Sequence, residues 1–212
     1  MMKLRVLRVL ALVALAGGCA SSTDPTPEQT TGGPPALTVA AVIKQVGAPG
    51  ESLPACPLPY DPATSAKSAG FSTTSVKAQP PASVTTSETA GAGSFLATIA
   101  PAVSVECDYS LGAATIHTRL LVTGKTGAAI NGLLPQLAAW SESTLSTLAD
   151  SFVKPALAAP VGKATLVPNG RAALVKLKVT DGEGALVVAV DAAAKLTAGQ
   201  LTAFTTALAA QV

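Results

Sequence analysis

The stretch VSVECDYSLGAATIHTRLLV, residues 103–122, decides the fold predicted for this chain. Apolar residues occupy every second position from Val103 to Tyr109, and a similar spacing returns from Ile116 to Val122. This period of two is typical of strands that bury one face. The run Leu111–Ala113 contains a glycine and favours a turn. The stretch therefore predicts a β-hairpin with Cys107 on its buried face.

Strand and helix signals also follow the hairpin. Two further strands are expected at Ala172–Thr180 and Ala185–Val190, with Asp181–Gly184 as the turn between them. The residues Thr197–Gln200 form a capping-box pattern, which predicts the start of a terminal helix. The inward residues of that helix are expected to be Leu201, Phe204 and Leu208.

Helical periodicity covers residues 128–152, where Pro135 either begins the helix or interrupts it. The buried stripe expected in this segment consists of Leu137, Trp140, Leu145, Leu148 and Phe152. Residues 37–47 favour a helix over a strand. The segment 80–93, rich in Pro, Ser, Thr and Gly, is expected to be a surface loop.

A short helix is predicted earlier in the chain. Asp61 suits its N-cap, Pro62 its first turn and Gly70 its C-terminal end. Helices combined with antiparallel hairpins predict an α+β fold. We therefore expect a single domain over residues 37–212, with an antiparallel sheet backed by helices and one disulfide.

The composition excludes one class of partner. Charged residues are 12% of the chain and aromatic residues 3%. The formal net charge is +2, but Lys3, Arg5 and Arg8 lie in a segment expected to be removed, which leaves 11 of the 14 basic residues against 12 acidic ones. Nucleic-acid binding needs clustered Lys and Arg. We therefore expect no nucleic-acid partner.

The first 18 residues are typical of an export signal. Basic residues near the start precede the uncharged apolar run Val9–Ala16, and two glycines separate that run from Cys19. Signal peptides combine a basic start with ~7–15 apolar residues, whereas a membrane-spanning helix needs ~18 or more. Residues 1–18 are therefore predicted to be a signal peptide.

The residues Leu15–Cys19 (LAGGC) resemble a bacterial lipobox, with Ala16 at the position where leucine is commonest. The resemblance implies that the Cys19 thiol receives a diacylglycerol, that cleavage falls directly before it, and that the new amine is acylated, for example by palmitate. Two or more acyl chains anchor stably, at ~0.8 kcal/mol per buried CH₂. The alternative is ordinary cleavage near Ala16 or Ala20, which would leave Cys19 as a free thiol.

Residues 20–36 are rich in Ser, Thr, Pro and Gly and have no periodicity. Such a segment cannot bury enough apolar surface to offset its ordering entropy. Its root-mean-square span is ~20–25 Å. Residues 19–36 are therefore expected to tether the domain to the extracytoplasmic face of the cell membrane.

The two remaining cysteines, Cys56 and Cys107, are an even pair, which in an exported protein indicates a disulfide. The chain-entropy model gives about 4 kcal/mol for closing a loop of this length. Two separate buried thiols are the alternative. His117 is the only histidine of the chain, and neither a metal site nor a cofactor is expected.

Three motifs resemble catalytic signatures but lack required parts. Gly124–Thr126 (GKT) lies between a strand and a helix, as in a phosphate-binding loop, but Arg119 stands where the first glycine is needed. Ser151–Lys154 and Lys125–Gly127 match S-x-x-K and K-T-G of penicillin-recognising enzymes, in reversed order and without S-D-N. His117 is expected on a polar, solvated strand face. No catalytic residue is predicted.

The layout is similar to that of small cysteine-paired lipoproteins of actinomycete envelopes. The resemblance is carried by Cys19 in its lipobox, by Cys56 before the short helix, by CDY at Cys107–Tyr109 and by the strand–strand–helix ending. The sequence PLPY after Cys56 departs from the leucine-rich start of that family. The resemblance implies a membrane-tethered extracytoplasmic domain, often PsbP-like in fold, and carries over no catalytic residue.

These observations favour a non-enzymatic binding or interaction module of the bacterial cell envelope, whose partner is an unidentified envelope protein. The alternative is a carrier of lipid or another apolar ligand at the membrane surface, which requires an apolar cavity of several hundred Å³. A hydrolase is a third hypothesis. It depends on whether His117 lies within hydrogen-bond reach of a serine or a carboxylate.

Overall fold

The structure is a computed structural model that describes residues 37–46, 56, 58, 61–71, 76–78, 83–112, 114–191 and 196–212. Its helices are Val39–Gln45 (α1), Pro62–Ser68 (α2), Phe95–Thr98 (α3), Ala128–Ser141 (α4), Leu145–Leu148 (α5), the π-helical turn Ala149–Val153 (η1), Lys154–Ala158 (α6) and Ala198–Ala209 (α7). Its strands are Val76–Ala78 (β1), Ser83–Thr86 (β2), Ala102–Leu111 (β3), Ala114–Thr123 (β4), Ala164–Leu166 (β5), Ala172–Leu177 (β6) and Glu183–Val190 (β7). The predicted α+β class is confirmed.

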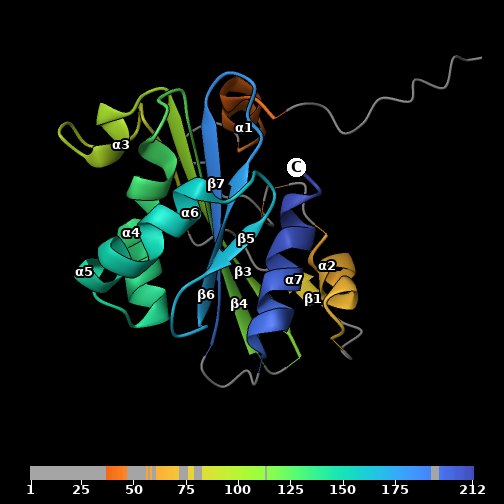
Figure 1. Cartoon of the computed structure of the whole chain (residues 1–212). Coiled ribbons are helices and arrows are strands. Elements are labelled where there is room, and N and C mark those ends of the chain that lie inside the picture. Colours follow the sequence, from red (N-terminus) through yellow and green to blue (C-terminus); the bar gives the residue numbers. More distant parts are fainter. Residues whose placement is uncertain are drawn as a thin grey trace, which may run out of the picture. The chain divides into compact units, whose positions relative to one another are not determined.

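The strands of the described residues form one antiparallel sheet in the order β1-β3-β4-β7-β6-β5 (Figure 1). The predicted hairpin is its centre, with Val105 of β3 opposite Leu120 of β4. Two short strands share the outer edge of β3, because β1 pairs with its C-terminal part and β2 with its N-terminal part. The hairpin thus organises the whole sheet.

Helices cover both faces of the sheet (Figure 1). One core contains the inward residues of the hairpin, including Val105 and Leu120, packed against α1, α2 and α7. The second core lies on the opposite face, where Leu121 and Val187 pack against α4, α5 and α6. Alternation along β3 and β4 sends successive side chains to opposite faces, so a single hairpin serves both cores.

The disulfide between Cys56 and Cys107 is confirmed, with a Cα–Cα distance of 5.7 Å. Cys107 is fully buried on the α7 side of β3, as the alternation predicted. Tyr109, two residues further on, is 2% exposed in the same core. The bridge therefore joins the segment before α2 to the centre of the sheet.

Local signals set several helix ends as predicted. The Asp61 carboxylate accepts hydrogen bonds from two backbone N–H groups of α2, and Gly70 after that helix has φ 76°. Thr197 and Gln200 form the predicted capping box of α7, whose inward residues Leu201, Phe204 and Leu208 are buried. The segment 39–45 is helical, as favoured.

The strands differ from the predictions in three places. Ser83–Thr86 lies inside the segment expected to be a loop, but forms β2, because Val84 pairs with Val105 along the open edge of β3. The strand β5 was not predicted; it pairs with β6 and begins four residues after Pro160. The predicted strand Ala172–Thr180 ends earlier, at Leu177.

The helical segment 128–152 is broken where a continuous helix was one option. Pro135 lies inside α4, and that helix ends at Ser141, followed by the C-cap residue Glu142, whose φ is 54°. The break turns the next segment, so that Leu145 at the start of α5 is 53% exposed instead of buried. Leu148 and Phe152 are buried as predicted.

Candidate functional site

A row of polar side chains lies on the α4 side of the central hairpin. Because side chains alternate along a strand, Glu106 and Asp108 of β3 lie on the face opposite Cys107. The register places Glu106 opposite Arg119 and Asp108 opposite His117. The row therefore contains two charged pairs, which we describe in turn.

Arg119 is the centre of the first pair. Its Nε donates a hydrogen bond to Oγ of Ser104 at 3.0 Å, and its Nη1 donates to Oε1 of Gln136 on α4 at 2.5 Å. The contact from Nη1 to the Glu106 carboxylate is longer, at 3.4 Å. No described residue accepts a hydrogen bond from Nη2. A guanidinium has five N–H donors, so this one is fixed in place with donors still available.

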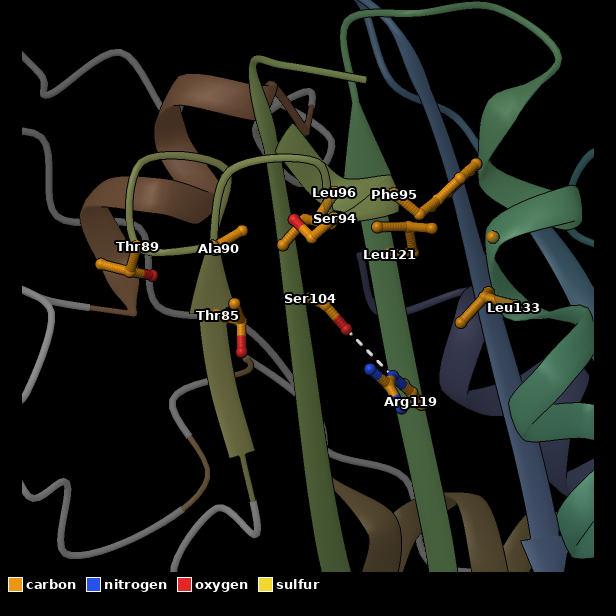
Figure 2. Close-up of a pocket in the computed structure, with 12 residues that line it drawn as sticks. Thr85, Thr89, Ala90, Ser94, Phe95, Leu96, Ser104, Arg119, Leu121 and Leu133 are labelled. Carbon is orange, nitrogen blue, oxygen red and sulfur yellow. Dashed lines mark hydrogen bonds between the residues drawn. The ribbon is translucent and has the colours of Figure 1, made fainter. Parts of the chain in front are cut away.

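A recess of 360 Å³ opens beside Arg119. Figure 2 shows Ser104 pointing toward Arg119 on neighbouring strands, with Phe95 near Leu121 and with Leu133 on the facing helix. The rest of the lining comes from Thr85, Thr89, Ala90, Gly91, Ser94, Leu96 and Gly132. Arg119 is the one charged residue among the described residues of this lining. The recess therefore offers apolar side chains, hydroxyl groups and a single cation.

The apolar wall depends on Gly132 of α4. A Cβ atom at this position would lie 2.4 Å from Cε1 of Phe95 and 2.6 Å from Cδ2 of Leu121, closer than carbon atoms can approach. Phe95 is 47% exposed, so one edge of its ring packs on α4 and another faces solvent. The absent side chain at Gly132 is what lets α3 approach α4 and complete the recess.

His117 is the centre of the second pair. Its Nδ1 lies 2.8 Å from Oδ1 of Asp108, and its Nε2 lies 3.0 Å from Oδ1 of Asp191, the residue after β7. The ring of Trp140 on α4 is 5.6 Å away, within the range of a cation–π contact. Trp140 and Arg171 help to line a smaller recess of 220 Å³ next to His117.

These contacts set the charge of His117. Burial lowers its pKa, but hydrogen bonds and charge from Asp191 and Asp108 outweigh burial, so the pKa of His117 is raised above its usual value. The hydrogen bond from His117 lowers the pKa of Asp191 in return. The prediction of a simply solvated histidine was wrong, because the partners come from β3 and from the end of β7.

Two carboxylates lie within hydrogen-bond reach of His117, so the condition set for the hydrolase hypothesis is met for an orienting carboxylate, whereas no serine is among the hydrogen-bond partners of the ring in the described residues. A histidine that serves as general base needs one ring nitrogen free to take a proton from a nucleophile. Both nitrogens of His117 instead lie beside carboxylates, which stabilise the charged form of the ring and leave neither nitrogen free. The arrangement is that of an ion-pair cluster that joins β3, β4 and the end of β7.

The remaining motifs have structural contacts. The Nζ of Lys125 donates to the carbonyl of Thr98 at 2.6 Å, and the Glu183 carboxylate accepts a hydrogen bond from the backbone N–H of Gly127. A phosphate-binding loop would offer its backbone N–H groups to a phosphate, but here the N–H of Gly127 is hydrogen-bonded to a carboxylate of the chain itself. The Oγ of Ser151 donates to the carbonyl of Thr147, one turn earlier in its own helical segment.

Sequence reasoning found only part of this site. Among the residues singled out from the sequence, Cys19 lies outside the described residues, and Cys107 lies on the opposite face of β3 from the recess. Arg119 was noted as a strand neighbour of His117, but its contact with Gln136 and the closure by Phe95 depend on helices from distant segments. The residues next to Arg119 in the sequence do not predict that Phe95 of α3 and Gln136 of α4 will lie beside it.

The comparisons give no external assignment. No family model matches the chain, and neither a search of curated proteins nor one of solved structures gives a match. No helix within the described residues is long and apolar enough to span a membrane. The same residues contain no group of His, Cys, Asp or Glu side chains that could hold a metal ion.

Proposed function

We propose that this chain is a non-enzymatic extracytoplasmic binding protein that holds a small amphipathic anion in the recess beside Arg119. The observation that carries the proposal is the lining of that recess, in which one fixed guanidinium faces apolar side chains. The proposal adopts the carrier alternative, because the recess meets the size that this alternative requires. We also propose that a lipid on Cys19 anchors the chain at the membrane.

The size and chemistry of the recess support this ligand class. Binding cavities for small molecules measure ~300–1,000 Å³ and combine apolar walls with a few placed polar groups. The recess, at 360 Å³, lies at the lower end of that range. Phe95, Leu96 and Leu133 offer contacts for a hydrocarbon chain. Hydroxyl groups such as those of Thr85 and Ser94 suit a polar head group.

The state of Arg119 supports an anion as that head group. Ser104 and Gln136 hold the guanidinium through Nε and Nη1, so a ligand bound at Nη2 would not need to order the side chain. Glu106 compensates the charge only in part, because its carboxylate makes the longest of these contacts and does not line the recess. A carboxylate head group could accept hydrogen bonds from Nη2.

Decanoate and decanol test the proposal, because the two share one hydrocarbon chain and differ in charge. Isothermal titration of the full mature chain should show that decanoate binds more tightly. Arg119→Gln should weaken decanoate binding about 10- to 100-fold, the effect of losing a hydrogen bond to a charged group, and should change decanol binding little. Arg171→Gln, which removes an exposed charge paired with Glu142, is the matched control and should leave decanoate binding unchanged.

Equal binding of the two probes, or unchanged decanoate binding in Arg119→Gln, would contradict the anion site. Reproducible turnover of a substrate by the purified chain would contradict the non-enzymatic role. The anchor is tested separately by mass spectrometry of the chain extracted from membranes. Acylation should be found on Cys19 and should be lost in Cys19→Ser, whereas an unmodified thiol at Cys19 would disprove the anchor.

A further inference from the structure

A groove of 370 Å³ lies at the end of the sheet where β6 passes into β7. Its aliphatic walls include Leu157 of α6, Val161 after that helix, and Val179 after β6. Leu157 is 45% exposed and Val161 56% exposed. Four large hydrophobic side chains are exposed among the described residues, and these are two of them. Half of the exposed large hydrophobic residues of the described part of the chain therefore line this groove.

Two lysines line the groove and a third follows one of its wall residues in the sequence. Lys176 and Lys178 line it, and Lys163 is an exposed residue two positions after Val161. The Nζ of Lys176 donates to the carbonyl of Leu157 at 2.6 Å, which holds one positive charge against the apolar wall. Glu183 is the acidic residue of the lining, and its carboxylate is hydrogen-bonded to a backbone N–H group at the start of α4. Asp181, directly before the lining residue Gly182, is a second carboxylate, so the three lysines exceed the carboxylates at the groove by one charge.

The N-terminal segment joins the domain at the same place. Leu37, the first described residue, forms a parallel bridge with Val179 of the groove, and its carbonyl accepts a hydrogen bond from Thr180 at 2.9 Å. The backbone N–H of Val39 donates to the Asp181 carboxylate at 2.8 Å, which fixes the start of α1 beside the same turn. Figure 1 shows α1 at this end of β7. Leu37, to which the preceding 36 residues with Cys19 are joined, therefore lies at the rim of the groove.

We infer that this groove is a docking surface for an anionic phospholipid bilayer. Leu157 and Val161 enter the head-group region, and Lys163, Lys176 and Lys178 lie against the lipid phosphates. Burial of apolar side chains and attraction between basic residues and anionic lipid both strengthen binding to a membrane surface. The inference rests on the anchor part of the proposed function, since a tether with a span of ~20–25 Å keeps the groove close to the membrane.

Fluorescence of the full mature chain on vesicles tests the docking surface. An environment-sensitive dye is placed at Val161→Cys and, as a matched control, at Leu145→Cys, which is equally exposed but lies on α5. With vesicles of phosphatidylcholine and phosphatidylglycerol, the dye at position 161 should shift to the blue, and the dye at 145 should remain water-like. Vesicles of phosphatidylcholine alone should give a smaller shift at position 161.

Charge variants test whether the lysines strengthen the contact between position 161 and the vesicles. Lys163→Gln with Lys178→Gln should lower the affinity of the dye-reported contact about fivefold for each lysine removed. Lys67→Gln with Arg171→Gln removes two exposed basic residues elsewhere and should have no effect. A water-like dye at position 161 on both vesicle types, or the same response from both charge variants, would overturn the docking surface.

Flotation separates this inference from the anchor. If the chain floats with both vesicle types while the dye at position 161 stays water-like, the result supports the lipid anchor and contradicts the docking surface. A chain that floats only with phosphatidylglycerol vesicles, and not after Lys163→Gln with Lys178→Gln, supports the docking surface and contradicts the anchor. The decanoate titration is independent of both results.

Discussion

Asp191 holds His117 from a position 74 residues later in the chain, with 3.0 Å between Oδ1 of the carboxylate and Nε2 of the ring. The contact ties the end of β7 to the middle of β4. Asp108 approaches the other ring nitrogen from β3, so the ring is held between β3 and the residue after β7. The pKa of His117 therefore reports the effect of these two carboxylates, which the tertiary structure brings to it.

We predict that the pKa of His117 lies above about 6.5, and that Asp191→Asn moves it back toward that value, since one of the two stabilising carboxylates is lost. Proton NMR resolves this directly, because the chain contains one histidine. Asp150→Asn, which removes an exposed carboxylate elsewhere, is the control. A His117 pKa at or below 6.5 in the unaltered chain would contradict the cluster.

The same shifts predict how the contribution of the cluster depends on pH. The pKa of His117 is higher in the folded chain, so its contribution is complete below about pH 6.5 and is lost as pH rises through the folded value. The pKa of Asp191 is lower in the folded chain, so its contribution is complete above about pH 4 and is lost as pH falls through the folded value.

The cluster therefore contributes most to the free energy of unfolding between about pH 4 and pH 6.5. Its side chains are 26% to 46% exposed, so we expect less than about 1 kcal/mol in total. Urea denaturation of His117→Ala against the unaltered chain should show the difference at pH 5.5 and lose most of it at pH 9. A difference that is larger at pH 9 would contradict the sign.

Gly132→Ala should separate stability from binding. Alanine favours a helix over glycine by about 1 kcal/mol, but the new Cβ atom displaces Phe95 and Leu121. We expect a change in the free energy of unfolding within about 1 kcal/mol of zero, and a loss of decanoate binding. Gly199→Ala is the matched control, since its Cβ atom would meet nothing closer than 4.0 Å; it should stabilise α7 and leave binding intact.

The disulfide should contribute about 4 kcal/mol to the free energy of unfolding, because it closes a loop of 51 residue steps. The double variant Cys56→Ala and Cys107→Ala, compared with the unaltered chain in guanidinium titrations, measures this. Titration of the unaltered chain in reductant is a second measurement that leaves the side chains in place. A loss below about 1 kcal/mol in both would show that the sheet does not depend on the bridge.

Thr205 of α7 offers a stabilising substitution. Its Oγ1 is buried without a hydrogen-bond partner among the described residues. Thr205→Val keeps the shape and removes the unsatisfied hydroxyl, so we expect a gain of about 1–2 kcal/mol in urea denaturation. Thr202→Val on the same helix is the control, because its Oγ1 donates to the carbonyl of Ala198 at 2.8 Å and should give no gain.

Local patterns predicted those parts of the fold whose information lies in adjacent residues. The hairpin follows from a period of two, and α7 from the capping residues Thr197 and Gln200. The segments that were predicted wrongly share one physical cause, because the structure of each depends on another segment that it packs against or follows. Ser83–Thr86 is a strand because the edge of β3 is open to it, and Leu145 is exposed because α4 ends at Ser141 and the chain turns at Glu142.

The sequence by itself determined the strand alternation of the hairpin, the caps at Asp61 and Thr197, and the face on which Arg119 and His117 lie, and it favoured the pairing of Cys56 with Cys107. Only the tertiary structure decided what those two side chains contact. Alternation fixes a side of the sheet within a few residues, whereas the partners of Arg119 and His117 come from α4 and from the end of β7. Which of these polar residues forms an ion-pair cluster and which lines a recess was settled by packing between segments far apart in the chain.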